Sequence, residues 1–461
     1  MSPTLPYWFA IALGGITLLF YLLSALWNRS KIDPISTRGA EEDFNLGLPE
    51  SRDKESLFAI ALVAAGTSLS TVFVFFLTAG AFFGWWILLS PIMFLLGNVA
   101  MFAVFRRIRA QGYFDEADRT VVGASGLVPF IVCRLTGSKG VGYGVLLLSL
   151  INLLSVLVLE LVVGVDVLTY LADHAAGTAV SGSTQFTIFA VSIGLLLSYV
   201  YIGGFRAVVA SDVWQMKLMR VAIAITAIAL AWAWVAGPHD ATHTPSLGGP
   251  PWGLVLGGFV LNVILANLFV PMAQESSWQR FRAFSFAGAM NEGKALRRSL
   301  WSAGLLWTGL IATSFLLLFV LPKDSASKLT SMSAVLEQMK GIDDSIFPLL
   351  IFPLMVVAGL SAMFSTADTC VSALLYLLEF PMAAKTDSTR KETREPRLRG
   401  SYYVAMALLF FASLAVYGFV RLWFNPTILQ LVFSVFSNLV VIAPAVFSAT
   451  FLPPWPAPQK L

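Results

Sequence analysis

The sequence predicts an all-α polytopic membrane protein, and three observations support this fold class. Of its 461 residues, 57% are hydrophobic and only 12% are charged, whereas a soluble domain carries about 25% charged residues. Apolar runs of about 20 residues recur along the chain, and each can cross about 30 Å of hydrocarbon as a helix. Basic residues concentrate in alternate linkers. This composition excludes a soluble enzyme, a disordered chain and a nucleic-acid-binding protein.

Eleven apolar runs are expected to span the membrane as helices. They cover residues 8–27, 57–83, 85–105, 144–171, 186–202, 218–236, 252–271, 300–321, 347–378, 402–420 and 427–451. Pro3 and Pro6 precede the first run, and no basic segment before it or A-x-A cleavage site is visible, so it is expected to be a retained span. The linkers are too short for a separate soluble domain, so residues 1–461 should form a single transmembrane domain.

Lys and Arg determine the expected orientation. If the N-terminus lies outside, the inside segments are 28–56, 106–143, 203–217 with Arg220, 272–299, 379–401 and the C-terminal tail. Of the 30 basic residues, 26 then lie inside, and the four outside are Lys323, Lys328, Lys340 and Arg421. Because cytoplasmic linkers are enriched in Lys and Arg, this asymmetry predicts a multi-pass protein of the cell (plasma or inner) membrane with a cytoplasmic C-terminus.

Acidic residues within or beside the spans are the first functional candidates, because an ionisable side chain at the bilayer centre costs about 2.5–3.5 kcal/mol on insertion scales. Glu160 lies about halfway across the fourth span, and Asp166 lies nearer its outer end. Asp212 lies at the start of the sixth span, and Asp368 lies toward the inner half of the ninth. For Glu160 three states stay open: protonated, solvated by a cavity, or facing a cationic ligand.

Three spans carry small and polar residues of the kind found where transporter helices break near the midplane and bind ions. The second span contains residues 65–71 (AGTSLST), and the seventh contains Gly257, Gly258, Asn262, Asn267 and Pro271. Both features are equally typical of close helix packing and of hydrogen bonds between helices. The ninth span places Ser365 and Thr366 just before Asp368, and such oxygens are hard ligands that Na⁺ prefers.

The sequence carries no catalytic constellation. Its three histidines are expected to lie in polar loops, so no span should offer a haem ligand and a zinc site is not expected. It contains no Ser-His arrangement, protease-type aspartate pair or metal triad. We therefore expect no enzymatic activity, no catalytic residues and no metal other than Na⁺.

Four segments resemble motifs of the sodium:solute symporter family, which includes the sodium/glucose, sodium/proline and sodium/sialic acid cotransporters. Residues 203–215 (GGFRAVVASDVWQ) resemble G-G-x-x-A-V-x-x-T-D-x-x-Q. Residues 266–280 resemble A-N-L-Y-Y-W-G-x-N-Q-x-x-x-Q-R, and residues 362–369 (AMFSTADT) resemble A-x-x-S-T/S-x-D-S/T. Residues 128–139 are similar, more loosely, to the T-x-P-E-F-x-x-x-R-F-G-S linker. The segments occur in the family's order, and the resemblance covers nearly the whole chain.

The resemblance implies a LeuT-type fold, in which two inverted five-helix repeats follow one extra helix. That arrangement needs eleven helices, the number of spans counted above. Residues 8–27 would form the extra N-terminal helix, residues 57–236 the first inverted repeat and residues 252–451 the second. The second and seventh spans would then be the broken helices.

The resemblance also implies a sodium site between the second and ninth spans, with Na⁺ as the coupling ion. The family's ligands map to the Ala362 carbonyl, the Ser365 and Thr366 hydroxyls, and two carbonyls near Thr67 and Ser70. Asp212 matches an acid that lies on the sodium exit route or in a site for a second cation, and Asp368 is assigned to the same role.

The resemblance places the solute site near the seventh span. Asn267 matches a substrate-binding amide of the sugar transporters, and Phe269 and Val270 stand at the positions of paired aromatic gates. The chain departs from the family here. Y-Y-W-G becomes residues 269–272 (FVPM), which removes the hydroxyls and the indole, and N-Q becomes residues 274–275 (QE).

Two further departures bear on the ligand. The polar pair that binds sugar on the second span falls on Phe73 and Val74, which argues against a sugar. Phe73, Phe75 and Phe269 instead predict an apolar pocket wall for a less polar solute. Glu160 stands where relatives often have Gln, which indicates a cationic substrate, or proton coupling that is added to sodium or replaces it.

We therefore expect a Na⁺-driven secondary symporter that moves a small organic solute by alternating access. Two alternatives remain open: a proton-coupled carrier centred on Glu160, and a non-transporting sensor module of the same fold. The expected partners are the small-molecule solute and the lipid bilayer, with no nucleic acid, and the protein is expected to be a monomer or a weak homo-oligomer.

Overall fold

The structure is a computed structural model that describes most of the chain. The described residues are 5–29, 48–49, 51, 53–66, 80, 83–110, 128–129, 132, 136, 138–236, 254–286, 290–321, 331–340, 351–383, 397–421, 442 and 446. Regular structure in these ranges is helical, as the predicted fold class requires. Residues 67–79 of the second predicted span and nearly all of 427–451 lie outside them, so the count of eleven spans stays a prediction.

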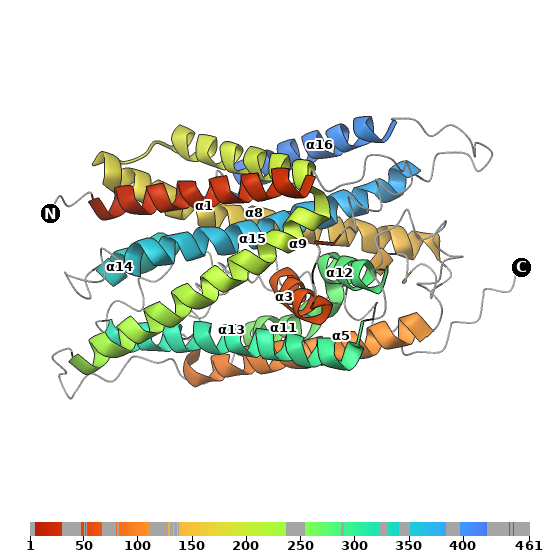
Figure 1. Ribbon diagram of the computed structural model, residues 1–461, viewed down its shortest axis with the longest axis horizontal. Coiled ribbons are helices and arrows are strands. Elements are labelled where there is room, and N and C mark those ends of the chain that lie inside the picture. Colours follow the sequence, from red (N-terminus) through yellow and green to blue (C-terminus); the bar gives the residue numbers. More distant parts are fainter. Residues whose placement is uncertain are drawn as a thin grey trace, which may run out of the picture.

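Long helices run roughly along the longest axis of the molecule (Figure 1). They are α1 (Leu5–Arg29), α5 (Leu89–Ala110), α8 (Lys139–Ala176), α9 (Gly182–Ala236), α13 (Glu292–Val320), α15 (Phe352–Ala383) and α16 (Arg397–Phe419). The shorter elements are α3 (Lys54–Gly66), the 3-10 helix η1 (Gly84–Leu88), α10 (Leu254–Phe259), the π-helix η3 (Val260–Leu265), α11 (Ala266–Ala273), α12 (Glu275–Phe286) and α14 (Met332–Lys340).

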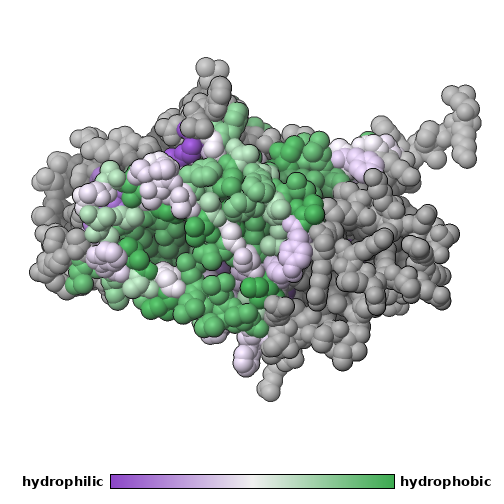
Figure 2. All heavy atoms as spheres, turned by 90° about the horizontal axis from the view of Figure 1, so that it is seen from above, coloured by the Kyte–Doolittle hydropathy of each residue, from purple (hydrophilic) through white to green (hydrophobic). Residues whose placement is uncertain are grey.

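Seven stretches of the described chain are long and apolar enough to cross a membrane. They are Leu5–Trp27, Gly84–Ala110, Gly140–Ala176, Gly182–Val235, Leu256–Ser285, Glu292–Val320 and Phe352–Leu378. Large apolar side chains point outward from them; Trp301 is 75% and Ile228 is 70% exposed. Figure 2 shows hydrophobic residues covering a broad area of one face. Because hydrocarbon solvates such a surface and water does not, the chain is a multi-pass membrane protein.

The helix α9 contains two of the predicted spans, 186–202 and 218–236. Gly204 separates them with φ 58° and ψ −163°, a backbone conformation that is essentially restricted to glycine. The segment 203–217, predicted to be a cytoplasmic linker, is helical instead, and most of it is buried. The kink therefore brings the residues after Gly204, including Asp212, into the bundle.

The helix α12 corrects the prediction that residues 272–299 form a polar linker. Its side chains Trp278, Arg280 and Phe281 are fully buried, and the apolar stretch continues to Ser285. Phe281 contacts three aromatic rings of α3 and α5, those of Phe58, Phe102 and Phe105. The chain thus folds back into the protein after α11.

The helix α15 lies at the centre of the bundle. It contacts α9, α8 and α1. Of the residues in its apolar stretch of 18, 89% are buried, compared with 22% for the corresponding stretch of α1. Because protein surrounds α15, the hydroxyl and carboxyl groups on it are removed from water and need partners from neighbouring helices.

Ion pairs join helix ends that the distribution of Lys and Arg assigns to the cytoplasmic side. Arg106 and Arg109 of α5 contact Glu292 at the start of α13, at 2.9 and 2.8 Å. Arg298 of α13 pairs with Asp53, just before α3, and its guanidinium lowers the pKa of that carboxyl. Three of the predicted cytoplasmic segments therefore meet at one end of the bundle.

Candidate functional site

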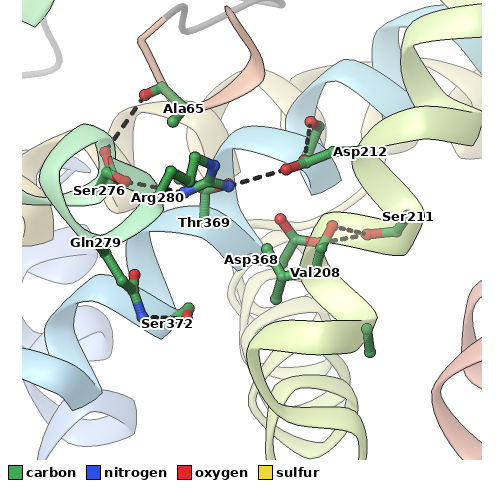
Figure 3. A network of polar contacts seen from close by, with 12 residues as sticks. Ala65, Val208, Ser211, Asp212, Ser276, Gln279, Arg280, Asp368, Thr369 and Ser372 are labelled. Carbon is green, nitrogen blue, oxygen red and sulfur yellow. Dashed lines mark hydrogen bonds and ion pairs between the residues drawn. The ribbon is translucent and has the colours of Figure 1, made fainter. Parts of the chain in front are cut away.

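Polar side chains of α9, α12 and α15 meet inside the bundle (Figure 3). The helix α15 supplies Ser365, Thr366, Asp368 and Thr369, and none of them is more than 2% exposed. Ser365 and Thr369 are four residues apart, so they lie on the same face of α15. That face meets the ion pair described next.

A fully buried ion pair links α12 to α9. Arg280 Nη2 lies 2.8 Å from Asp212 Oδ2, and both side chains are 0% exposed. Arg280 also donates to Thr369 Oγ1 (2.8 Å) and to the Ser276 carbonyl (3.1 Å), and its guanidinium carbon lies 5.5 Å from the centroid of the Phe205 ring. This degree of pairing is expected, because an uncompensated buried charge is strongly destabilising.

Serine hydroxyls extend the network on both sides of Asp212. Ser365 Oγ donates to Asp212 Oδ1 (2.9 Å), and Ser211 Oγ donates to Asp368 Oδ2 (3.0 Å). Asp368 Oδ1 is buried and has no hydrogen-bond partner among the described residues. With both carboxyl groups ionised, Asp212, Asp368 and Arg280 carry a net charge of −1, so one further positive charge would be stabilised here.

Three of the predicted sodium ligands lie in or beside this network. Ser365 donates its hydroxyl hydrogen, as above, and Thr366 Oγ1 donates to the Ala362 carbonyl (3.3 Å). A hydroxyl that donates keeps the lone pairs of its oxygen, so both oxygens can still coordinate a cation. The two predicted carbonyl ligands near Thr67 and Ser70 lie outside the described residues.

The described part of the second span reaches the same network. The helix α3 ends at Gly66, and the Ala65 carbonyl accepts a hydrogen bond from Ser276 Oγ at 3.4 Å. Ser276 is the residue whose carbonyl binds Arg280. The second and ninth spans therefore approach a common polar region, as a sodium site between them would require.

The described part of the seventh span, 254–271, stays helical but widens into a π-helix that contains Asn262, and the extended backbone comes after its predicted end at residue 271. The helix α10 passes into the π-helix η3, and Gln274 then adopts an extended backbone (φ −84°, ψ 119°) between α11 and α12. Asn267 Nδ2 donates to the Asn262 and Val263 carbonyls, both at 3.0 Å. The amide nitrogen of Asn267 thus stabilises the widened turn of its own span.

The structure places the other substrate candidates on separate helices. Glu160 is 0% exposed on α8. Phe269 of α11 is partly buried against the hydrophobic core. Phe73 and Phe75 lie outside the described residues. A solute site that combines these residues stays a prediction.

Arg280 is the site residue that the sequence reasoning missed. The expected cytoplasmic linker 272–299 includes it among its basic residues. A usable signal is present in its neighbours, because Trp278, Phe281 and Phe284 surround it in sequence and large aromatic residues are uncommon in a solvated linker. In the structure all three aromatic side chains are buried with it.

Comparison with known proteins identifies the fold. No family model matches the chain, and no curated protein matches its sequence. A substrate-bound, outward-open Na⁺-coupled sialic acid symporter is similar in structure, with a TM-score of 0.59 and 13% identity over 96% of this chain and 87% of that one. A manganese transporter of Eremococcus coleocola, bound to an aromatic bis-isothiourea compound, has a TM-score of 0.51 and 16% identity over 87% and 80% of the two chains. The chain therefore has the fold of membrane transporters, and not that of an enzyme.

Proposed function

We propose that this protein is a Na⁺-coupled secondary active symporter that moves a small organic solute by alternating access. The observation that carries the proposal is the buried network on α15, where Ser365 and Thr366 present hydroxyl oxygens beside the acids Asp212 and Asp368. Oxygen ligands of these types suit a small hard cation. The transporter fold supports the same function.

The charge of the network supports a cation at this place. With both carboxyl groups ionised, Asp212 and Asp368 carry one more charge than Arg280 neutralises, and all three side chains are buried. A Na⁺ ion held by the Ala362 carbonyl and the two hydroxyls of α15 would bring the cluster to neutrality. Na⁺ and solute that both favour one state of the transporter are coupled by linkage, because each raises the affinity for the other.

The proposal assigns the remaining candidates as follows. Carbonyls near Thr67 and Ser70 complete the sodium site, and Asp212 and Asp368 line the exit route or a second cation site. The solute contacts are Asn267, Phe269, Phe73, Phe75 and Glu160. One helix (residues 8–27) precedes two inverted repeats (57–236 and 252–451), and one part of the bundle rocks against the other around the site. The protein lies in the cell membrane with its N-terminus outside.

The test is solute uptake into proteoliposomes with and without an inward sodium gradient. The solute is first found by a thermal-shift screen of amino acids, carboxylates, nucleobases, sugars and amines, because a ligand that binds the native state stabilises it. In wild type the gradient should drive uptake. Ser365→Ala/Thr366→Ala should lower sodium-driven uptake by about tenfold or more, since two ligand oxygens are lost.

Ser413→Ala is the matched control. Ser413 is a fully buried serine on α16 outside the described network, so its removal should leave sodium-driven uptake intact. Uptake that is independent of sodium and insensitive to the double substitution contradicts the proposal. Solute binding without any flux would favour the sensor module.

Full burial of Glu160 favours proton coupling as the second candidate. A buried carboxyl group can carry a proton between the two sides if access to it alternates. In that case uptake follows a pH gradient, and Glu160→Gln abolishes this pH dependence while the protein still folds. An unchanged pH dependence in Glu160→Gln excludes Glu160 as the coupling group.

A further inference from the structure

We infer that Arg280 is a cation built into the chain, which occupies the Asp212 carboxylate and so keeps a second Na⁺ ion out of the transporter. The inference rests on the proposed sodium coupling. It extends that proposal from the existence of a sodium site to the number of sodium ions that the protein carries, and of the two roles proposed for Asp212 it favours the exit route over a second cation site.

The guanidinium of Arg280 stands where a free cation would otherwise bind. Three oxygens lie within hydrogen-bond distance of it: Asp212 Oδ2 and Thr369 Oγ1 at 2.8 Å each, and the Ser276 carbonyl at 3.1 Å. They come from α9, α15 and α12 (Figure 3). A carboxylate, a hydroxyl and a carbonyl are the ligand types that hard cations use in proteins, and all three residues are at most 1% exposed.

Arg280 cannot exchange with solvent as a free ion does. Its side chain is attached to α12 and is 0% exposed, and the Phe205 ring lies on one side of the guanidinium. An arginine side chain also stays protonated at every physiological pH. The place next to Asp212 is therefore permanently filled by one positive charge, which would repel a Na⁺ ion at the same carboxylate.

The same contact reaches the proposed sodium site. Asp212 Oδ2 accepts from Arg280, while Asp212 Oδ1 accepts from Ser365, which is a proposed sodium ligand. The charge of Asp212 is thus shared between the tethered cation and the sodium site. Arg280 should therefore control both how many Na⁺ ions bind and how tightly the first one binds.

The test counts sodium ions bound to the purified full-length protein by equilibrium dialysis against sodium-22 chloride. Wild type should bind one Na⁺ per chain. Arg280→Met removes the charge while keeping much of the side-chain volume, and it should bind two. Arg280→Lys keeps the charge and should bind one. One bound ion in Arg280→Met, or two in wild type, overturns the inference and leaves sodium coupling intact, whereas no bound ion in wild type contradicts the sodium coupling on which it rests.

Arg280→Met leaves the buried Asp212 carboxylate unpaired, and such an unpaired charge can impair folding. A comparison of a single and a double variant at Asp212 and Arg280 avoids this problem. In Asp212→Asn the guanidinium loses its counter-charge beside Ser365, so Na⁺ binding should weaken by about tenfold or more. Asp212→Asn/Arg280→Gln removes both charges and should return to within about threefold of the wild-type affinity, as expected for two coupled residues. Equal affinities in the single and the double variant overturn the inference.

Discussion

At Gly97 the helix α5 packs closely against the backbone of α11. A Cβ atom at this position would lie 2.3 Å from the Leu268 carbonyl oxygen and 3.1 Å from that of Asn267. Backbone oxygens cannot rotate away as side chains do, so an added methyl group has to push the helices apart. We expect Gly97→Ala to lower the free energy of unfolding by about 1–3 kcal/mol, measured by unfolding of the detergent-solubilised protein.

Gly144→Ala is the control for this prediction. Gly144 lies on an exposed face of α8, and a Cβ atom there would meet nothing within 4 Å. Alanine is the better helix former, so this substitution should leave stability unchanged or raise it by up to about 1 kcal/mol. Equal stabilities of Gly97→Ala and Gly144→Ala would show that α5 and α11 are not in close contact.

Single residues of the site were predictable to different degrees. Ser365, Thr366, Asp212 and Asp368 stand out in the sequence because acids and paired hydroxyls are expensive within or next to apolar spans, and the structure places all four in one buried region. Arg280 could not be found in this way. Its partner Asp212 is 68 residues away, and a count of linker charges treats a buried arginine and a solvated one alike.

At the scale of elements, the kink in α9 decides where Asp212 lies. In Gly204→Ala, alanine has to adopt the backbone angles of Gly204, φ 58° and ψ −163°. This conformation costs about 1–3 kcal/mol for residues other than glycine. We expect this variant to unfold at a lower temperature and to bind Na⁺ more weakly, because relaxation of the kink moves Asp212 relative to α15. Thermal unfolding and sodium-22 binding measure the two effects.

Gly194→Ala provides the matched change on the same helix. Its nearest neighbour would be Phe410 Cε2 at 3.9 Å, an ordinary contact, and its backbone is helical. Thermal stability and Na⁺ binding should both stay at the wild-type level. If Gly204→Ala behaves in the same way, the kink tolerates a side chain and does not position Asp212.

Apolar runs predicted the long helices well, because hydrocarbon demands about 20 apolar residues of each span. They could not predict the helical segment 203–217 or the helix α12, which were expected to be cytoplasmic linkers. Both segments carry charged residues whose partners come from other helices, as Asp212 and Arg280 show. A hydropathy pattern records the composition of one segment, whereas burial of a charge depends on what the folded chain places opposite it.

At the scale of the whole molecule, the two ends of the bundle are held by different contacts. One end carries the arginine–carboxylate pairs of α5, α13 and Asp53. Elsewhere two residues of α8 contact Glu337 of α14: Tyr170 Oη lies 2.6 Å and His174 Nε2 lies 3.5 Å from Glu337 Oε2. The ring of Tyr7 of α1 stacks on that of His174, with 4.8 Å between the ring centroids. These residues all belong to segments predicted outside or to the outer ends of spans, so the fold brings them together, while the side that they face stays a prediction. The repeat boundaries stay predictions, since they depend partly on residues that the structure does not describe.

The orientation can be tested with two single cysteines in a protein that carries Cys133→Ser and Cys370→Ala. Ser181→Cys lies in the exposed turn between α8 and α9, and Ala110→Cys lies at the exposed end of α5. A membrane-impermeant maleimide added to spheroplasts should label Ser181→Cys and not Ala110→Cys, because the basic residues near position 110 retain that end in the cytoplasm. Detergent should make both sites reactive. Labelling of Ala110→Cys in intact spheroplasts would contradict the predicted orientation. The arginine–carboxylate pairs would then lie at the outer surface, where an excess of basic residues is not expected.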